Sequence, residues 1–159
     1  MARGPLDGTQ VNLAQAAALF AAMQHTLTTA THKALDDAAK IVKAEAKREI
    51  GDYQPDKGPF AAWAELKSGT KSDRVKQGFP ENEPLLRTGA LRDSIEHTVK
   101  SHHEAEVGSD SLIAVYQELG TTNIPPRSFL GGAAFTKSHE VKALLGSSVI
   151  ATIMGKKAI

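Results

Sequence analysis

The stretch SIEHTVKSHHEAEVGSD, residues 94–110, alternates between apolar and polar side chains, and this alternation decides the fold. Ile95, His97 and Val99 fall on one face of an extended chain, while the charged and polar residues between them fall on the other. A period of two residues is typical of a β-strand that has one buried face. The alternation returns after the histidine pair, so the stretch predicts two strands.

A loop over residues 101–103 joins these strands into a β-hairpin. It places Val99 opposite Ala105, which keeps the two apolar faces together. It also places Lys100 opposite Glu104, where the opposite charges favour the pairing. We therefore expect an antiparallel hairpin in this register.

Residues 12–50 predict a long helix, because they contain no Gly or Pro and are rich in Ala, Leu, Lys and Glu. Gly51 is a stop signal. The β-branched residues within 26–32 lower helix propensity, so the sequence allows either one bent helix or two helices. The apolar residues recur at helical spacings, as the following set shows: Leu13, Ala17, Phe20, Leu27, Leu35, Ala38, Val42 and Ala46.

Two more helices are predicted after the hairpin. Residues 111–120 form a short one, with Ser109, Asp110 or Ser111 as N-cap and Gly120 as stop. A second helix runs from 131 to about 156, with an apolar stripe made of Val141, Leu144, Leu145, Val149 and Ile153.

These elements predict an α+β fold, in which a long N-terminal helix and a C-terminal helix pack on a small antiparallel sheet containing the β-hairpin. The 159 residues suit a single domain, 1–159. Its parts are an N-terminal helical region, 1–50, and a loop-rich segment, 51–84, with one short helical turn around 60–66. Residues 85–159 carry the hairpin, a proline loop and the C-terminal helix.

Composition excludes several classes of protein. Nineteen basic and eighteen acidic residues leave a net charge of +1, which gives no argument for general nucleic-acid binding. The absence of cysteine excludes disulfides and thiolate chemistry. The apolar stretch 16–23 is far shorter than the roughly 20 residues that span a bilayer, and no targeting signal is visible. We expect a soluble protein made in a cytoplasm, with no membrane contact.

Residues that could carry chemistry are few. No phosphate-binding glycine loop or hydrolase motif occurs. A metal site could be drawn from His97, His102, His103, Glu104 and Glu106, but a solvated hairpin tip with His97 turned inward is the preferred interpretation. We expect no cofactor and no metal.

Acid–base chemistry and duplex binding are the other two candidates. Tyr116, Glu118 and Asp93 could act as acid–base groups, but a lone carboxylate at a helix end is usually structural. We therefore expect no enzyme and no catalytic residue. A basic run on the first helix could bind nucleic acid, although interleaved acidic residues favour pairing within the helix. The basic run is Lys40, Lys43, Lys47 and Arg48, and the acidic residues are Asp36, Asp37, Glu45 and Glu49.

Three segments follow one another in a recognisable order: LLRTGALRDSI (85–95), AEVGSD (105–110) and AVYQELGTTNIPPRSFLGG (114–132). This order resembles the tail-completion and virion-morphogenesis proteins of tailed bacteriophages and prophages. An upstream segment, WAELKSGT (63–70), resembles their Mu-like branch through Trp63, Leu66 and Thr70. The matching residues are Thr88, Gly89, Leu91, Arg92, Ser94, Ile95, Val107, Gly108, Tyr116, Glu118, Gly120, Thr121, Pro125, Pro126, Arg127, Phe129 and Leu130.

The resemblance implies a non-enzymatic assembly protein at the head–tail junction, with no small-molecule substrate. Such proteins form rings, commonly hexameric, that complete the tail, contact other tail and neck proteins, and at most let DNA pass through the lumen. The implied location is the virion, and the host cytoplasm during assembly. A tail terminator and a head-side connector remain alternatives within the class. The chain departs from the family pattern at Gln117 and Leu119. The family positions expected to be structural are Thr88, Gly89, Leu91, Arg92, Ser94, Tyr116, Glu118 and Gly120.

The proline loop is the candidate assembly interface. Its two prolines fix φ and remove backbone donors, which lowers the entropy cost of ordering the loop against a partner. Arg127 offers a planar fork to carboxylates or carbonyls of a neighbouring subunit. Phe129 either fills a pocket in that neighbour or packs under the sheet of its own subunit, with Arg127 then pairing Glu118 or Asp93. The hairpin is the candidate for the second patch of the interface. The proposed loop residues are Ile124, Pro125, Pro126, Arg127, Phe129 and Leu130.

Overall fold

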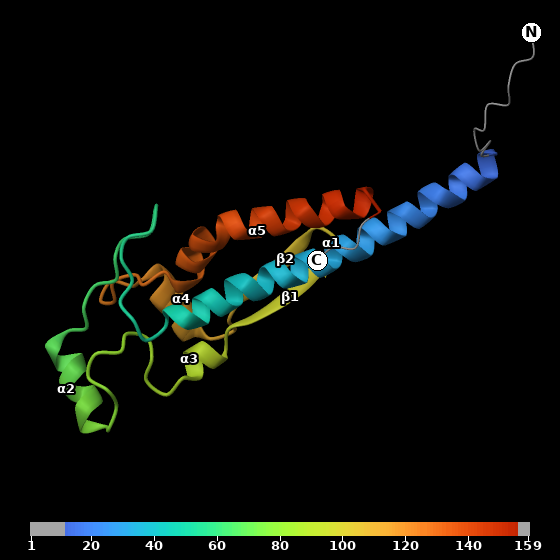
Figure 1. The fold of residues 1–159 in the computed structure, drawn as a ribbon. Coiled ribbons are helices and arrows are strands. Elements are labelled where there is room, and N and C mark those ends of the chain that lie inside the picture. Colours follow the sequence, from blue (N-terminus) through green and yellow to red (C-terminus); the bar gives the residue numbers. More distant parts are fainter. Residues whose placement is uncertain (1–11, 156–159) are drawn as a thin grey trace, which may run out of the picture.

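The computed structural model describes residues 12–155, and its architecture is the expected α+β fold. The helix α1 lies beside α5, and the antiparallel hairpin β1–β2 packs on α1 (Figure 1). The elements are α1 (Leu13–Glu49), α2 (Ser68–Lys76), α3 (Ala90–Asp93), β1 (Glu96–Ser101), β2 (Glu104–Gly108), α4 (Leu112–Leu119) and α5 (Phe129–Ile153).

The first helix is continuous, which decides between the two alternatives that the sequence left open. Its start is fixed by a capping box: the Asn12 side chain accepts from the Gln15 amide at 2.8 Å, and the Gln15 side chain accepts from the Asn12 amide at 3.0 Å. The threonine-rich stretch stays helical. Its hydroxyls donate back to carbonyls four residues earlier, as in the 2.9 Å bond from Thr26 to Ala22. Gly51, at φ +113°, ends the helical path as predicted.

The hairpin confirms the predicted strands and corrects part of the register. Val99 lies opposite Ala105, and inward and outward side chains alternate along β1 as expected. The Lys100–Glu104 pairing is wrong, because an irregularity between Val99 and Ser101 places Ser101 opposite Glu104. The turn therefore holds only residues 102–103, and Lys100 forms its ion pair with Glu106 at 3.1 Å.

The helical turn predicted around residues 60–66 is also wrong. Phe60 and Lys57 exchange backbone hydrogen bonds of 3.0 and 2.8 Å, and the Trp63 amide donates to Gln54 at 2.9 Å. These bonds use backbone groups that a helix would need for itself, so this stretch is extended. The helix of the loop-rich segment is α2, which begins at Ser68.

The core is small and rich in alanine. It lies where the C-terminal half of α1 meets the start of α5 and the residue before β1. Phe129 and Trp63 supply its largest side chains. The buried apolar residues are Ala34, Ala38, Ala39, Ala46, Ile50, Trp63, Ile95, Ala114, Phe129 and Ala133.

The last two helices differ from expectation mainly at their ends. Ser111 is the N-cap of α4, and its hydroxyl accepts from the Ile113 amide. Helix α5 begins two residues earlier than predicted, at Phe129, and its predicted end near residue 156 lies outside the described residues. Ile153 belongs to the predicted apolar stripe but is 56% exposed. Near the end of α5 it is Ser148 that is buried against the subunit. Within residues 12–155, no helix is long and apolar enough to cross a membrane.

A buried ion pair closes the end of α1. The Glu49 side chain is fully buried in the last helical turn, and its Oε1 atom lies 2.5 Å from the Lys57 ammonium. Lys57 also donates to Gln54 at 3.0 Å. Burial raises the pKa of Glu49 above its ordinary value of 4.5, and the Lys57 charge opposes that rise.

We predict that Lys57→Met destabilises the protein more at pH 7 than at pH 4. Removing one partner of a buried pair costs about 3–5 kcal/mol when the remaining group is charged. The variant raises the pKa of Glu49 further, so the folded state binds more protons than the unfolded state and loses stability as pH rises above 4.5. Urea unfolding of variant and wild type at both pH values measures the difference.

The control is Lys33→Met, which removes the exposed partner of Asp37. That change should alter stability by less than about 0.5 kcal/mol. An equal loss at pH 4 and pH 7 for Lys57→Met would contradict the ion-pair argument.

Candidate functional site

Three separate segments meet around one hollow of about 580 Å³, which we call the proline-loop pocket. Its walls come from residues 64–74, 85–91 and 113–127. Three of the four stretches on which the resemblance was drawn contribute to these walls, although they are far apart in the sequence. The fourth, residues 105–110, lies at another hollow. The lining includes four basic residues and one acidic residue, Glu65. The pocket is therefore the natural centre of a candidate site.

Arg127 locks the proline loop onto another part of the same subunit. Its guanidinium donates to the Ala64 carbonyl through Nε at 3.2 Å and through Nη2 at 2.7 Å. The side chain is only 5% exposed, and this burial lowers the pKa of Arg127. The Arg127 guanidinium thus binds backbone carbonyls of its own chain. The predicted pairing of Arg127 with Glu118 or Asp93 is wrong.

Arg74 is a second buried arginine in the pocket wall, and the sequence analysis missed it. It donates to the Pro80 carbonyl at 2.7 Å and to the Leu86 carbonyl at 2.6 Å. Both partners are backbone groups, so no complementary charge in the sequence marks the contact. At the rim, Arg87 pairs with Asp73 at 2.7 Å.

Glu118 caps α5 and has the structural role that the sequence favoured over acid–base chemistry. Its two carboxylate oxygens accept from the Leu130 amide at 2.9 Å and the Gly131 amide at 2.8 Å. A negative charge at a helix N-terminus is stabilised by the free amides and by the helix dipole. This capping also explains why α5 starts earlier than predicted.

Gly120 makes the turn that leads into the proline loop. Its φ is +76°, and a Cβ atom there would lie 2.9 Å from the Ile124 carbonyl oxygen and 2.9 Å from the Pro126 nitrogen. The turn is closed by the Thr121 amide, which donates to Ile124 at 2.8 Å. Only glycine fits this position without strain.

Phe129 does not offer its side chain to a partner, contrary to one of the two alternatives. It is fully buried in the core of its own subunit, and Leu130 is half-buried against that core. The exposed part of the loop is residues 121–123 together with Pro126, while Ile124 and Pro125 are half-buried along the pocket.

The remaining residues that carry the resemblance divide between turn contacts, the edge of the core and the surface. Thr88 accepts from the Ala90 amide at 3.3 Å, and Gly89, at φ +87°, precedes α3. Leu91 packs on the core. Arg92 lies 3.8 Å from Asp93, and Tyr116 is half-exposed on α4.

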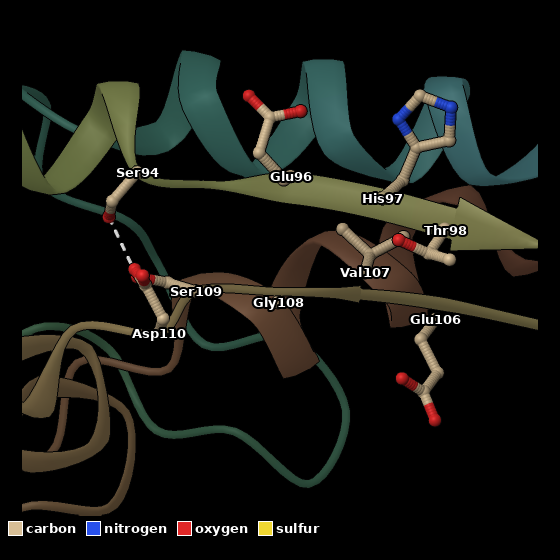
Figure 2. Close-up of a pocket in the computed structure, with 9 residues that line it drawn as sticks. All are labelled: Ser94, Glu96, His97, Thr98, Glu106, Val107, Gly108, Ser109 and Asp110. Atoms are coloured by element: carbon tan, nitrogen blue, oxygen red, sulfur yellow. Dashed lines mark hydrogen bonds between the residues drawn. The ribbon is translucent and has the colours of Figure 1, made fainter.

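A second hollow, of about 700 Å³, lies over the start of the hairpin (Figure 2). At its edge the Ser94 and Ser109 hydroxyls are 2.7 Å apart. Glu96 and His97 turn toward α1, where Glu96 pairs with Lys43 at 2.5 Å and His97 contacts Asp36 at 3.0 Å. The described residues contain no group of three or more His, Asp or Glu placed to hold a metal ion.

Three of the four cations in the basic run of α1 are engaged within the subunit. Lys40 pairs with Asp36, Lys43 with Glu96 and Arg48 with Glu45, each at 2.5 Å. The pKa values of Glu45 and Glu96 are lowered, chiefly by the hydrogen bonds from Arg48 and Lys43. Cations paired in this way are less available to phosphates.

Comparisons of the chain with protein-family models, with curated proteins and with solved structures find no match.

We predict that Glu118→Ala destabilises the fold by about 1–2 kcal/mol, as the loss of a helix N-cap does. The reason is that two backbone amides of α5 lose their acceptor. Chemical denaturation measures the loss. Glu140→Ala, which removes an exposed carboxylate from the middle of the same helix, is the matched control. Equal stability of the two variants would rule out the capping role.

Phe129→Ala is predicted to cost about 3–5 kcal/mol through the cavity it leaves in the core. Phe135→Ala, at a half-exposed position on the same helix, should cost much less. Thermal and urea unfolding compare the two. A Phe129→Ala subunit that keeps wild-type stability and fails only in assembly would restore the interface role for this side chain.

Proposed function

We propose that this chain is a structural virion protein of a tailed phage or prophage, which completes the tail and joins it to the head as a ring subunit. The proposal rests on the ordered motifs of the sequence. The observation that carries it furthest is that three of the four motif segments contribute to the walls of the proline-loop pocket.

The contacts of the motif residues fit an assembly role better than catalysis. Glu118 holds the start of α5, and Arg127 holds residue 64, so both are used to fix the shape of the proline loop. A loop held in this way presents a preformed surface, which reduces the entropy lost on binding a partner. Residues 121–126 are the part that we assign to contacts with a neighbouring subunit.

The proposed partners are further copies of the chain, in a ring that is hexameric by resemblance, and other tail and neck proteins. DNA enters at most as a passenger through the ring lumen. A tail terminator or a head-side connector is the alternative within this class. The other alternative, a nucleic-acid-binding module on α1, is weakened because Lys40, Lys43 and Arg48 already have carboxylate partners.

Light scattering coupled to size exclusion, across protein concentration and salt, tests the proposal. A discrete ring, or a monomer that forms a ring when purified tails are added, is the expected result. Electron microscopy of the mixture should then place the ring at the tail end that receives the head. A protein that never associates with tails, and instead binds DNA with a steep salt dependence, would support the α1 module in its place.

A further inference from the structure

The first half of α1 is an apolar helix that is largely exposed in the described structure. We call residues 13–32 the arm; its N-terminal part extends past the end of α5 and past the hairpin (Figure 1). Residues 13–26 are exposed except for Ala16, whereas residues 27, 28, 30 and 31 are half-buried. The arm contains no Asp, Glu, Lys or Arg. Leu13 is 87% exposed and Phe20 72% exposed, and Leu19 and Met23 are also exposed.

The arm continues the stripe by which α1 packs within the subunit. In the second half of the helix, that stripe is buried at Ala34, Ala38 and Ala46. The same spacing leads back through the half-buried Leu27 to Phe20 and Leu13, which are exposed. A helix of this length is only marginally stable in water without packing, so the arm needs a surface to cover it.

A second apolar surface lies on α4, and it faces away from the subunit. We call it the α4 patch; its residues are Leu112, Ile113, Val115, Tyr116 and Leu119, all exposed. Its members at i, i+3, i+4 and i+7 form the stripe that an amphipathic helix normally buries. The polar side of α4 is turned inward instead, since the Glu118 carboxylate caps α5. Exposed apolar patches of this kind mark interaction sites.

The two surfaces are at opposite ends of the molecule. The arm is the N-terminal part of a 37-residue helix, which at 1.5 Å per residue is about 55 Å long. The α4 helix lies near the other end of α1 (Figure 1). The arm and the α4 patch of one chain therefore cannot meet, whereas those of two copies can.

We propose that the arm of one copy docks on the α4 patch of the next copy, in a head-to-tail contact between identical chains. The stripe of Leu13, Ala17 and Phe20 has the i, i+4, i+7 spacing that packs against the eight-residue α4 stripe as one helix on another. Neither surface offers a free charge that selects a differently charged partner. Two unlike patches at opposite ends make a heterologous interface, which forms a ring if the rotation between successive copies closes and an open filament if it does not. The contact specifies how neighbouring subunits bind each other in the ring proposed above, and its closure into a ring rests on that proposed function.

This contact replaces the hairpin as the second patch of the interface. The outward face of the hairpin carries Lys100 and Glu106, which are charged, solvated and paired with each other. The arm offers a larger apolar surface. The α4 patch is continuous with the proline loop, because Ile113 lines the same pocket as Ile124 and Pro125.

Cysteine cross-linking tests the contact directly, because the natural chain contains no cysteine. Phe20→Cys and Leu119→Cys each introduce one thiol at an exposed position. The two variants are purified separately, checked by circular dichroism, mixed at the highest soluble concentration and oxidised mildly. Val75→Cys, an exposed apolar position on α2, is the matched control partner for Phe20→Cys.

The expected result is a covalent dimer in the Phe20→Cys and Leu119→Cys mixture, well above the amount in either variant alone and in the Val75→Cys mixture. A dimer of Phe20→Cys alone would mean that two arms pair with each other, and it would overturn the proposal. Equal cross-linking with Val75→Cys, or no cross-link in any mixture, would overturn it too.

The outcomes also separate this inference from the function on which it rests. A ring on the tail without the 20–119 cross-link leaves the virion function standing and removes the arm contact. The cross-link in a chain that never associates with tails keeps the contact and removes the virion function. In that case the head-to-tail contact builds another closed ring or an open filament.

Discussion

The close approach of α1 to both α5 and the hairpin is the constraint on which the remaining structure depends. Alanines at positions 34, 38 and 46 make it possible, because a larger side chain would separate the elements. A core built in this way buries little area per residue, and the chain has few aromatic residues to enlarge it. Hydrogen bonds and ion pairs of buried polar side chains therefore help to fix the positions of the loops. The Glu49–Lys57 pair, the Glu118 cap and the Arg127 fork each hold a loop against a helix or another loop.

Much of this arrangement could be predicted from the sequence, because periodicity reports which face of an element is apolar. The long first helix and the hairpin follow from such patterns. The ends of α4 follow from its cap and stop residues, although the sequence left three candidates for the N-cap. The register at the hairpin turn could not be predicted, since one irregular residue at Lys100 changes the pairing without changing the alternation. The position of α2 was missed for a similar reason: backbone pairing around Phe60 overrides local helix propensity there.

The motif residues located the candidate site in the sequence, but they did not predict the direction in which their side chains point. A proline-rich loop with Arg127 and Phe129 has the same sequence whether those side chains point outward or inward, and in the structure both are buried. Arg74 gave no signal, because its partners are backbone carbonyls. The stripe on α4 shows the converse case. Its spacing predicts an apolar face, and only the fold reveals that the face is turned away from the core.

The threonines of the arm make its surface less hydrophilic than their hydroxyl groups suggest. Thr26, Thr29 and Thr31 each donate their hydroxyl hydrogen to a carbonyl four residues earlier, at 2.9, 3.0 and 2.8 Å. A hydroxyl that is satisfied inside its own helix loses little on dehydration, and the methyl group of each threonine remains to make contacts. Hydropathy scales count these residues as polar, although they behave here more nearly like valine. The part of the arm nearest the rest of the subunit is thus less hydrophilic than its residue types indicate.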